Sequence, residues 1–178
     1  NGDNTFEFFD DFNGGSLDTN KWTLNSGSVN LSSGILTFSA TGNDQYLYSK
    51  NNNECVADTS IVMRLRFSGT YGDRWGQNWW SCSSFLYRSS LIAAYATSDK
   101  AGIGSYVGAY YNWEIWRNGS SQSQWFIDNT LKYTYGAGAT SGVWFTCNTG
   151  GSIYCDWVFV RKRISTEPTP SFGAEVAN

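Results

Sequence analysis

The chain has 178 residues, of which 17% are aromatic and 15% are charged, and its formal net charge at pH 7 is −3. A domain of this length hides roughly 70% of the surface that its unfolded chain would expose. The longest basic run is Arg161-Lys162-Arg163, and no apolar stretch approaches the roughly 18 residues of a membrane span. We therefore expect no nucleic-acid partner and no membrane span.

The first half of the chain reads as short strands separated by polar turns. The motif of residues 8–22 contains an apolar opening strand and then a Leu-Asp-x-x-x-Trp step. Two short strands around 35–38 and 46–48 follow, with a polar turn at 41–44 between them. Apolar residues then alternate with Val62, Arg64 and Arg66 through 61–67, which predicts a strand with one buried face.

The second half continues the same pattern. Trp113–Arg117 and Gln124–Ile127 flank Asn118-Gly119-Ser120, which predicts a hairpin because Asn-Gly accepts positive φ. A tight turn at Asp128-Asn129 leads into a strand at 131–135. Around a dozen short strands without helical periodicity predict an all-β fold, a two-sheet antiparallel β-sandwich of the jelly-roll type.

The last strand, within 154–161, is apolar on both faces. Strict alternation places Tyr154, Val158 and Val160 on one face and Trp157 and Phe159 on the other. We expect this strand to pair with the opening strand, and its second apolar face to be covered by a linker, a neighbouring domain or an identical subunit. The sandwich is predicted to span residues 1–164, followed at 165–178 by a proline-containing linker or extended tail.

The four cysteines favour disulfides over free thiols. The chain has no histidine and no CxxC motif, so a zinc site is poorly supplied with ligands. A hairpin centred on Gly151 would place Cys147 across from Cys155, and by elimination Cys55 would pair with Cys82. Two Asn-x-Ser sequons, at Asn30 and Asn118, are candidate glycosylation sites, although such triplets arise by chance in a chain of this composition.

The opening strand, the Leu-Asp-x-x-x-Trp step, the segment 29–38 and the closing Asp156-Trp157-Val158-Phe159-Val160-Arg161 together resemble the concanavalin A-like lectin/glucanase superfamily. More narrowly, the chain resembles lectin-like modules of archaeal and bacterial surface proteins, which often follow a domain of unknown function. The resemblance implies a jelly roll in which one sheet is concave and often carries a ligand. It also implies an extracellular or cell-surface location.

The same resemblance implies one structural Ca²⁺ ion that joins the first strand to the last. The side-chain ligand would be Asp156, and backbone carbonyl ligands would come from near Asp11 and Gly34. Hard oxygen ligands of this kind suit calcium. In the alternative interpretation, Asp156 accepts hydrogen bonds from neighbouring backbone and holds no ion.

Catalysis is not expected from the sequence. Glucanases of this superfamily carry Glu-x-Asp-x-x-Glu or a close relative on one concave strand, and the chain has no such motif. Without histidine, Ser-His-Asp and Cys-His chemistry are unavailable. Glu7 and Asp10 are interpreted as a solvated strand end, whereas a pair such as Asp58 with Asp73 stays open.

Carbohydrate binding remains the main functional hypothesis. Sugar sites combine aromatic rings with amide and carboxylate groups, and the candidate residues are Trp75, Gln77, Asn78, Trp79 and Trp113. The competing interpretation is that these rings belong to the core. We expect a non-catalytic carbohydrate-binding or adhesion module of a surface protein, with a glycan partner. The alternatives are a self-assembling subunit of an extracellular filament or sheath and a divergent glycoside hydrolase.

Overall fold

The computed structural model describes residues 2, 5–68, 74–77, 83–88, 91–96, 99–136 and 142–163, and for 74–77 and several residues between 83 and 100 it describes the backbone alone. The tail expected at 165–178 therefore lies outside the described residues. Within the described part of the chain, no helix is long and apolar enough to cross a membrane.

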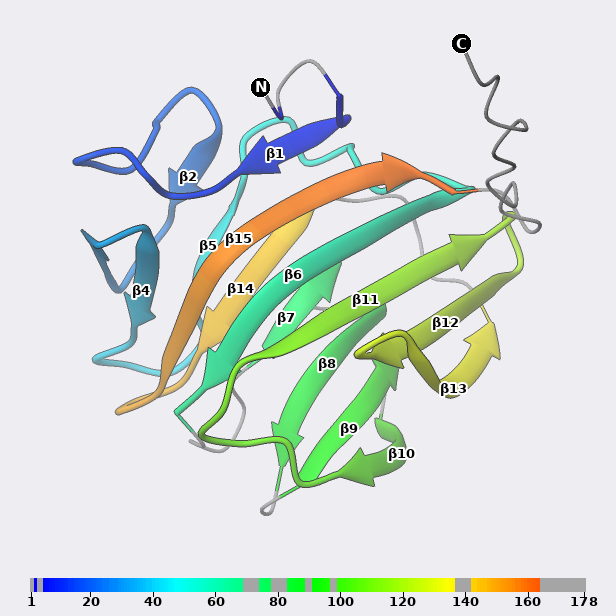
Figure 1. Cartoon of the computed structure of the whole chain (residues 1–178). Helices are drawn as coiled ribbons and strands as arrows, with labels where there is room; N and C mark the ends of the chain where they lie inside the picture. The colour runs from blue at the N-terminus through cyan, green and yellow to red at the C-terminus, as the bar shows by residue number, and fades with distance from the viewer. Residues whose placement is uncertain are drawn as a thin grey trace, which may run out of the picture.

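The predicted two-sheet antiparallel sandwich is confirmed (Figure 1). The first sheet has the order β13-β12-β11-β6-β15-β4-β3, and β1 also pairs with β15. Its strands are β1 (Phe8–Asp10), β3 (Ser28–Ser32), β4 (Ile35–Ser39), β6 (Thr59–Phe67), β11 (Tyr111–Asn118), β12 (Gln122–Ile127), β13 (Thr130–Gly136) and β15 (Ser152–Lys162).

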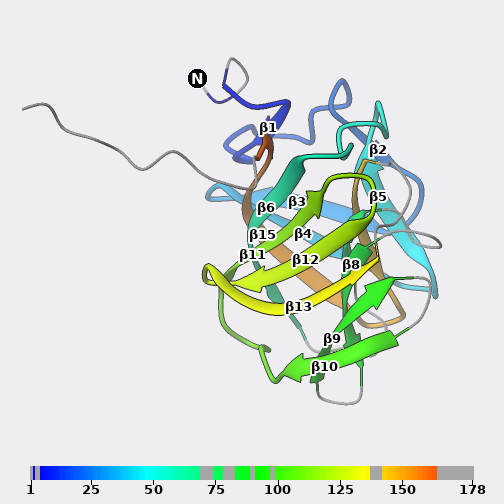
Figure 2. The same ribbon diagram turned by 90° about the vertical axis from the view of Figure 1, so that its right-hand side faces the viewer.

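The second sheet lies behind the first in Figure 1 and has the order β10-β9-β8-β7-β14-β5-β2. The edge strands β13 and β10 approach each other at one side of the sandwich, as Figure 2 shows. The strands of this sheet are β2 (Trp22–Leu24), β5 (Gln45–Ser49), β7 (Arg74–Gln77), β8 (Ser83–Arg88), β9 (Leu91–Ala96), β10 (Asp99–Gly104) and β14 (Val143–Cys147).

The core forms where the alternating apolar residues of the two sheets meet. In β6, the four residues from Ile61 to Phe67 that were expected to face inward are all fully buried. Trp113 of β11 and Trp125 of β12 are also fully buried, and each indole Nε1 donates to a backbone carbonyl, Trp113 to Leu65 at 3.0 Å and Trp125 to Ser84 at 2.9 Å. The buried rings therefore keep their polar atoms satisfied.

The predicted hairpin is confirmed as β11 and β12, which pair from Trp113 with Ile127 to Asn118 with Gln122. Gly119 in its turn has a φ of 63°. The next turn, between β12 and β13, has positive φ at both Asp128 and Asn129. Such a pair of φ values is typical of a two-residue turn that follows the twist of its strands.

The terminal strands lie side by side, as expected. Phe8 pairs with Val160, Phe9 with Phe159, and Asp10 with Val158. The Leu-Asp-x-x-x-Trp step then forms a turn in which the carbonyl of Asp18 accepts from the backbone of Lys21 and Trp22. Trp22 is buried, and its Nε1 donates to Asp10 Oδ2 at 2.7 Å. The first strand is thus tied to both sheets.

A β-bulge corrects the predicted faces of the last strand. Between Cys155 and Trp157 the pairing with β6 shifts by one residue, so Asp156 is the extra residue. The shift places Val158 and Val160 in the core with Cys155, whereas Tyr154 lies on the half-exposed outer side. Strict alternation failed here because a bulge reverses the order of the faces.

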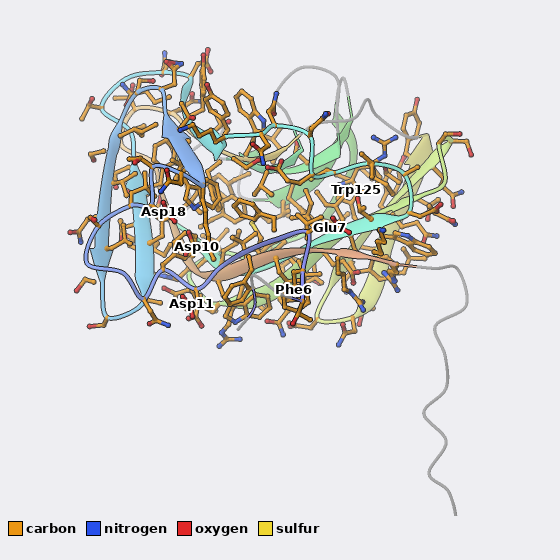
Figure 3. All side chains as sticks on the ribbon, turned by 90° about the horizontal axis from the view of Figure 1, so that it is seen from above. Phe6, Glu7, Asp10, Asp11, Asp18 and Trp125 are labelled. Atoms are coloured by element: carbon orange, nitrogen blue, oxygen red, sulfur yellow. The ribbon has the colours of Figure 1, made fainter. Side chains whose placement is uncertain are left out.

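The N-terminal segment covers part of the second apolar face of β15. Phe6 stacks on Phe159 with ring centroids 4.4 Å apart, and Phe159 stacks in turn on Trp157 at 5.4 Å. Figure 3 shows Phe6 beside β15, with Asp10 and Asp11 following along the same segment. The apolar face that suggested stacking of subunits therefore has a partner within the chain.

The expected bridge between Cys147 and Cys155 is wrong. Residues 148–151 do not form a hairpin but carry the chain from β14 in the second sheet to β15 in the first. The two thiols are not joined, since the Cys147 sulfur contacts Phe38 O at 3.8 Å and that of Cys155 contacts Trp157 O at 3.3 Å. Burial, with the Asp156 and Asp10 charges, raises the pKa of the Cys155 thiol. Cys82, the expected partner of Cys55, lies outside the described residues.

Candidate carbohydrate-binding site

Three aromatic rings gather on the outer face of the second sheet. Strand β14 lies between β5 and β7, with Trp144 opposite Tyr48 on one side and Gly76 on the other. The Trp144 and Tyr48 rings stack with centroids 4.6 Å apart and planes 14° apart, and Tyr46 lies 5.2 Å from Trp144. All three rings are half-buried. They form what we call the aromatic cluster, Tyr46, Tyr48 and Trp144.

The orientation of Trp144 is fixed by the loop after β5. Its Nε1 donates to Asn52 Oδ1 at 2.8 Å, and the same oxygen accepts from the backbone of Gly142 at 3.1 Å. Tyr48 stacks on the indole from β5, and the residue paired with Trp144 on the other side, in β7, is Gly76, which has no side chain. A ring held in this way on the outer face of a sheet suits stacking against the apolar face of a sugar.

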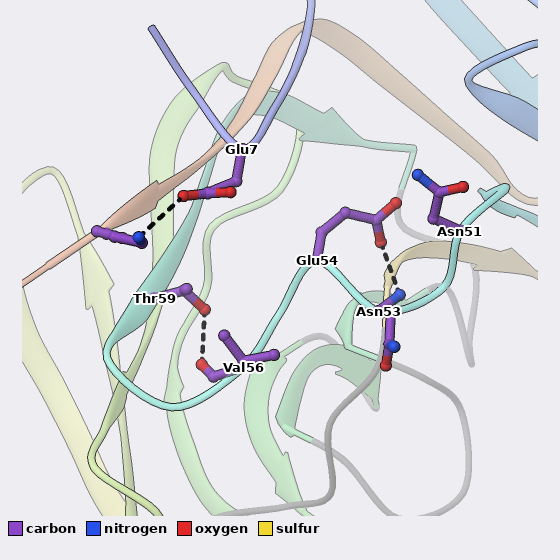
Figure 4. A pocket seen from close by; sticks show the side chains of 7 residues that line it. Glu7, Asn51, Asn53, Glu54, Val56 and Thr59 are labelled. Carbon is purple, nitrogen blue, oxygen red and sulfur yellow. Dashed lines mark hydrogen bonds and ion pairs between the residues drawn. The ribbon is translucent and has the colours of Figure 1, made fainter.

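The same loop lines a polar pocket of about 380 Å³ (Figure 4). Glu54 Oε2 accepts from Ser49 Oγ at 2.7 Å and from the backbone of Asn53 at 3.0 Å, so its carboxylate is held in place. Glu7 pairs with Lys162 at 3.6 Å on the other side of the pocket. Asn51, Asn53, Glu54, Glu7, Lys162, Val56 and Thr59 make up the lining.

The strands of the second sheet offer almost no carboxylates, whereas the loop after β5 carries Glu54. Strands β2, β5, β7, β8, β9 and β14 contain no Asp or Glu, and the only acidic residue in the strands of this sheet is Asp99 of β10. A reaction at the aromatic cluster would therefore draw its acid and base from connections such as the Glu54 loop.

The structure disagrees with one of the predicted carbohydrate ligands. Trp113 is 0% exposed, and its ring packs edge-on against Phe67 and Phe85 in the core, so it cannot contact a ligand at the surface. The strand pattern of β11 gives both faces large side chains, which is why the sequence did not separate core from surface here.

The other four predicted ligands lie in β7 or directly after it. Trp75 and Gln77 lie in β7, beside β14, but their side chains are outside the described part of the structure, as are Asn78 and Trp79. The aromatic cluster itself was missed, because the alternation through Tyr46 and Tyr48 did not reveal which strand would lie next to β5.

The three predicted calcium ligands come from segments that converge at the edge of β15. The edge of β15 pairs with β4 up to Cys155 and with β1 from Val158, so the Asp156 bulge falls between the two partners. A side-chain Cβ placed on Gly34 would lie 2.8 Å from Asn13 Oδ1 and 3.9 Å from the Asp11 carbonyl oxygen. The Asp156 carboxylate pairs with Arg64 Nε at 3.2 Å. Carbonyl, amide and carboxylate oxygens are the donor types that calcium prefers.

Two further observations concern metals and glycosylation. Within the described residues, no group of three or more Cys, Asp or Glu side chains is placed to hold a metal ion, which leaves mixed backbone and side-chain donors as the arrangement to consider.

The two sequons differ in accessibility. Asn30 is exposed in β3, whereas the Asn118 side chain donates to Gln122 Oε1 at 3.4 Å. Asn30 is therefore the more accessible of the two sequons.

Comparison with known proteins gives a short family match and a long structural one. The family model described as domain of unknown function DUF2341 matches residues 1–25. No curated protein matches the chain. An endo-acting O-glycanase of the human gut microbiota superposes with a TM-score of 0.64 at 12% identity, covering 89% of this chain and 100% of that one.

Two further solved structures are similar. The endo-β-1,3-glucanase of Pyrococcus furiosus has a TM-score of 0.63 at 11% identity, with 87% of this chain and 93% of the enzyme covered. A protein named as a sialidase has a TM-score of 0.69 at 12% identity, with 89% of this chain but only 19% of the sialidase covered. At such identities the likeness concerns the fold, and function has to be argued from the site.

The expectation of a protein without enzymatic activity is corrected by these comparisons. Solved structures that share the fold across nearly the whole chain are glycan-cleaving enzymes, among them the O-glycanase and the Pyrococcus glucanase. The fold is therefore one that supports glycan cleavage, and the missing Glu-x-Asp-x-x-Glu motif does not by itself exclude enzymatic activity. The facing antiparallel sheets, the paired terminal strands and these structural matches show that the chain has the concanavalin A-like sandwich fold.

Proposed function

We propose that the chain recognises a polysaccharide outside the cell, with a sugar ring stacked on Trp144 at the outer face of the second sheet. The observation that carries the proposal is the aromatic cluster. Trp144 is held by Asn52 and stacks on Tyr48, and it is paired with Gly76 on the other side. Aromatic rings held in this way lose little entropy when a ligand binds.

The polar groups that would bind the sugar hydroxyls come from the loop that also lines the pocket. Asn51, Asn53 and Glu54 come from the same loop as the Asn52 that holds Trp144. Amide and carboxylate groups on the loop that holds a stacking ring can take the hydroxyls of a neighbouring sugar unit. The fold is shared with enzymes that cleave glycans, which agrees with a polysaccharide as the ligand class.

The test is affinity electrophoresis of the 178-residue chain through gels that contain laminarin, xyloglucan or galactan. We expect at least one of these neutral polymers to retard the chain, and Trp144→Ala to weaken that binding by about tenfold or more, as for other aromatic anchors. Tyr135→Ala is the matched control, since it removes an exposed ring from the first sheet. Reducing ends measured in the same samples distinguish cleavage from binding.

Two results would overturn the proposal. In one, no neutral polymer retards the wild-type chain. In the other, Trp144→Ala and Tyr135→Ala bind equally well, which would locate recognition away from the aromatic cluster.

We also propose that one Ca²⁺ ion binds at the Asp156 bulge, where Asp11, Asn13 and Gly34 meet the last strand. Its role would be structural, because this position joins β1, β4 and β15 and belongs to the first sheet, not to the sheet that carries the aromatic cluster. When bound, the ion would supply positive charge to the oxygen atoms that converge there.

A further inference from the structure

Arg66 lies in the middle of a row of side chains on the outer face of the first sheet. Strand pairing sets Tyr154 opposite Arg66 on one side, with Thr37 beyond it on β4. Tyr110, just before β11, lies on the other side. The Arg66 guanidinium carbon is 3.9 Å from the centre of the Tyr154 ring and 5.6 Å from that of Tyr110. Two tyrosines therefore clamp a planar cation.

Arg66 differs from several other cations of the first sheet because no carboxylate in the described part of the chain pairs with it. Arg64 pairs with Asp156 at 3.2 Å, and Lys162 pairs with Glu7 at 3.6 Å. Arg161 and Arg163 both pair with Glu114. Among the described residues, the Arg66 side chain takes part in no ion pair and no hydrogen bond, and its Nε is buried without a partner.

A partly buried guanidinium without a counter-ion favours the binding of an anion. Its Nε cannot reach water, whereas its two Nη groups are not among the buried unpartnered atoms and so keep contact with solvent. Partial removal from water strengthens the attraction of the remaining donors for a negative group. The fork geometry of arginine matches a carboxylate or a sulfate, which it binds through two parallel hydrogen bonds.

The surroundings favour an anion carried by a sugar. The neighbouring row across β4, β15 and the end of β6 consists of the hydroxyl residues Ser39, Ser152 and Ser68, and Ser39 Oγ lies 2.7 Å from Ser152 Oγ. Hydroxyl groups and a tyrosine ring beside a cation are suited to a ligand that carries hydroxyls and one negative charge.

From this arrangement we infer that the outer face of the first sheet holds a second polysaccharide site, in which Arg66, clamped by Tyr110 and Tyr154, binds the carboxylate or sulfate group of an acidic polysaccharide. The site goes beyond the proposed function. It lies on the opposite sheet from the aromatic cluster, and it recognises charge, whereas the cluster recognises the face of a neutral sugar.

The experiment measures binding of the whole chain to four polymers: polygalacturonate for carboxylate, dextran sulfate for sulfate, dextran as the neutral control and polyglutamate as a carboxylate without sugar. We expect one or both acidic polysaccharides to bind at least about tenfold more tightly than dextran and polyglutamate. Arg66→Gln should then lose about tenfold or more, the size of a charge-assisted pair. The polymer with the larger loss identifies the anion.

Three variants make the result specific. Lys162→Gln is the matched control, since it removes one positive charge from an exposed ion pair, and its binding should stay within about twofold of wild type. Arg66→Lys keeps the charge but not the fork, so it should lose an intermediate amount. It also carries the test if Arg66→Gln does not fold. Trp144→Ala should leave acidic binding unchanged, so that failure of either site is seen separately.

The inference is overturned by any of three outcomes. Polyglutamate could bind as tightly as the acidic polysaccharides, which would point to an acidic peptide. Lys162→Gln could lose as much as Arg66→Gln, which would point to general charge attraction. Lastly, neither acidic polysaccharide could bind more tightly than dextran.

Discussion

The outer faces of the two sheets are built by the same alternation of side chains, yet they carry different chemistry. On the first sheet, arginines are held by carboxylates and rings, as in the contact of Arg163 with Glu114, Trp116 and Phe126. On the second sheet, Tyr46, Tyr48 and Trp144 stack on one another, and the central strands have no acidic residue. The comparison shows that a solvent-facing side of a sandwich can be organised either by charge or by aromatic stacking.

The charged organisation of the first sheet can be broken at Glu114. This carboxylate is 9% exposed and accepts from Ser60 Oγ and from Arg163 Nη1 at 2.8 Å, with Arg161 at 3.8 Å. Glu114→Ala would remove a largely buried carboxylate that contacts two guanidiniums and the Ser60 hydroxyl. We expect the free energy of unfolding in urea to fall by about 3 kcal/mol.

Glu7→Ala is the matched control for this prediction. It makes the same truncation at an exposed ion pair, with Lys162, and should cost about 0.5 kcal/mol or less. Equal losses from both variants would show that the buried pair contributes no more than the exposed one.

Raising the salt concentration should weaken binding at the first sheet much more than binding at the second. Binding of acidic polymers at Arg66 depends on charge and should weaken by about tenfold when NaCl rises from about 0.05 to about 0.5 M. Binding of neutral polymers at Trp144 depends on stacking and should change by less than about twofold. Titrations of both polymer classes over this range measure the difference, and a parallel loss in the two series would contradict the division between the faces.

Calcium should stabilise the chain through the first sheet, at the Asp156 bulge. At about ten times its dissociation constant, a bound ion adds about 1.4 kcal/mol, which raises the melting temperature of a chain this long by about 4 °C. Scanning calorimetry with CaCl₂ and with EDTA measures the shift. Asp156→Asn should remove it, whereas Asp44→Asn, in an exposed turn, should retain it. A wild-type chain that melts at the same temperature in both buffers would argue against the ion.

Much of the fold could be predicted, because strands and turns depend on local sequence patterns. The alternation through β6, the Asn-Gly turn at Gly119 and the pairing of β1 with β15 were all confirmed. The errors share one cause, which is long-range placement. Residues 147–155 had the spacing of a hairpin, but the chain crosses from one sheet to the other there, so Cys147 and Cys155 are not bridged.

The candidate site was predictable in kind but not in position. The sequence indicated that aromatic rings and amides would meet at a sugar-binding surface, and it favoured 75–79 and Trp113. Trp113 lies in the core, and the rings that do gather on a face come from strands almost one hundred residues apart in the chain, β5 and β14. Nothing in the spacing of Tyr48 and Trp144 marks them as neighbours.

The sequence by itself determined the strand pattern, the sharp turns and the all-β class, because side-chain alternation and turn chemistry depend on a few adjacent residues. Only the tertiary structure decided which strands became neighbours, which face Tyr154 occupies after the Asp156 bulge, and that Arg66 was left without a carboxylate. Those outcomes depend on strand order and register, which are set by packing of the whole core and are not local to any segment.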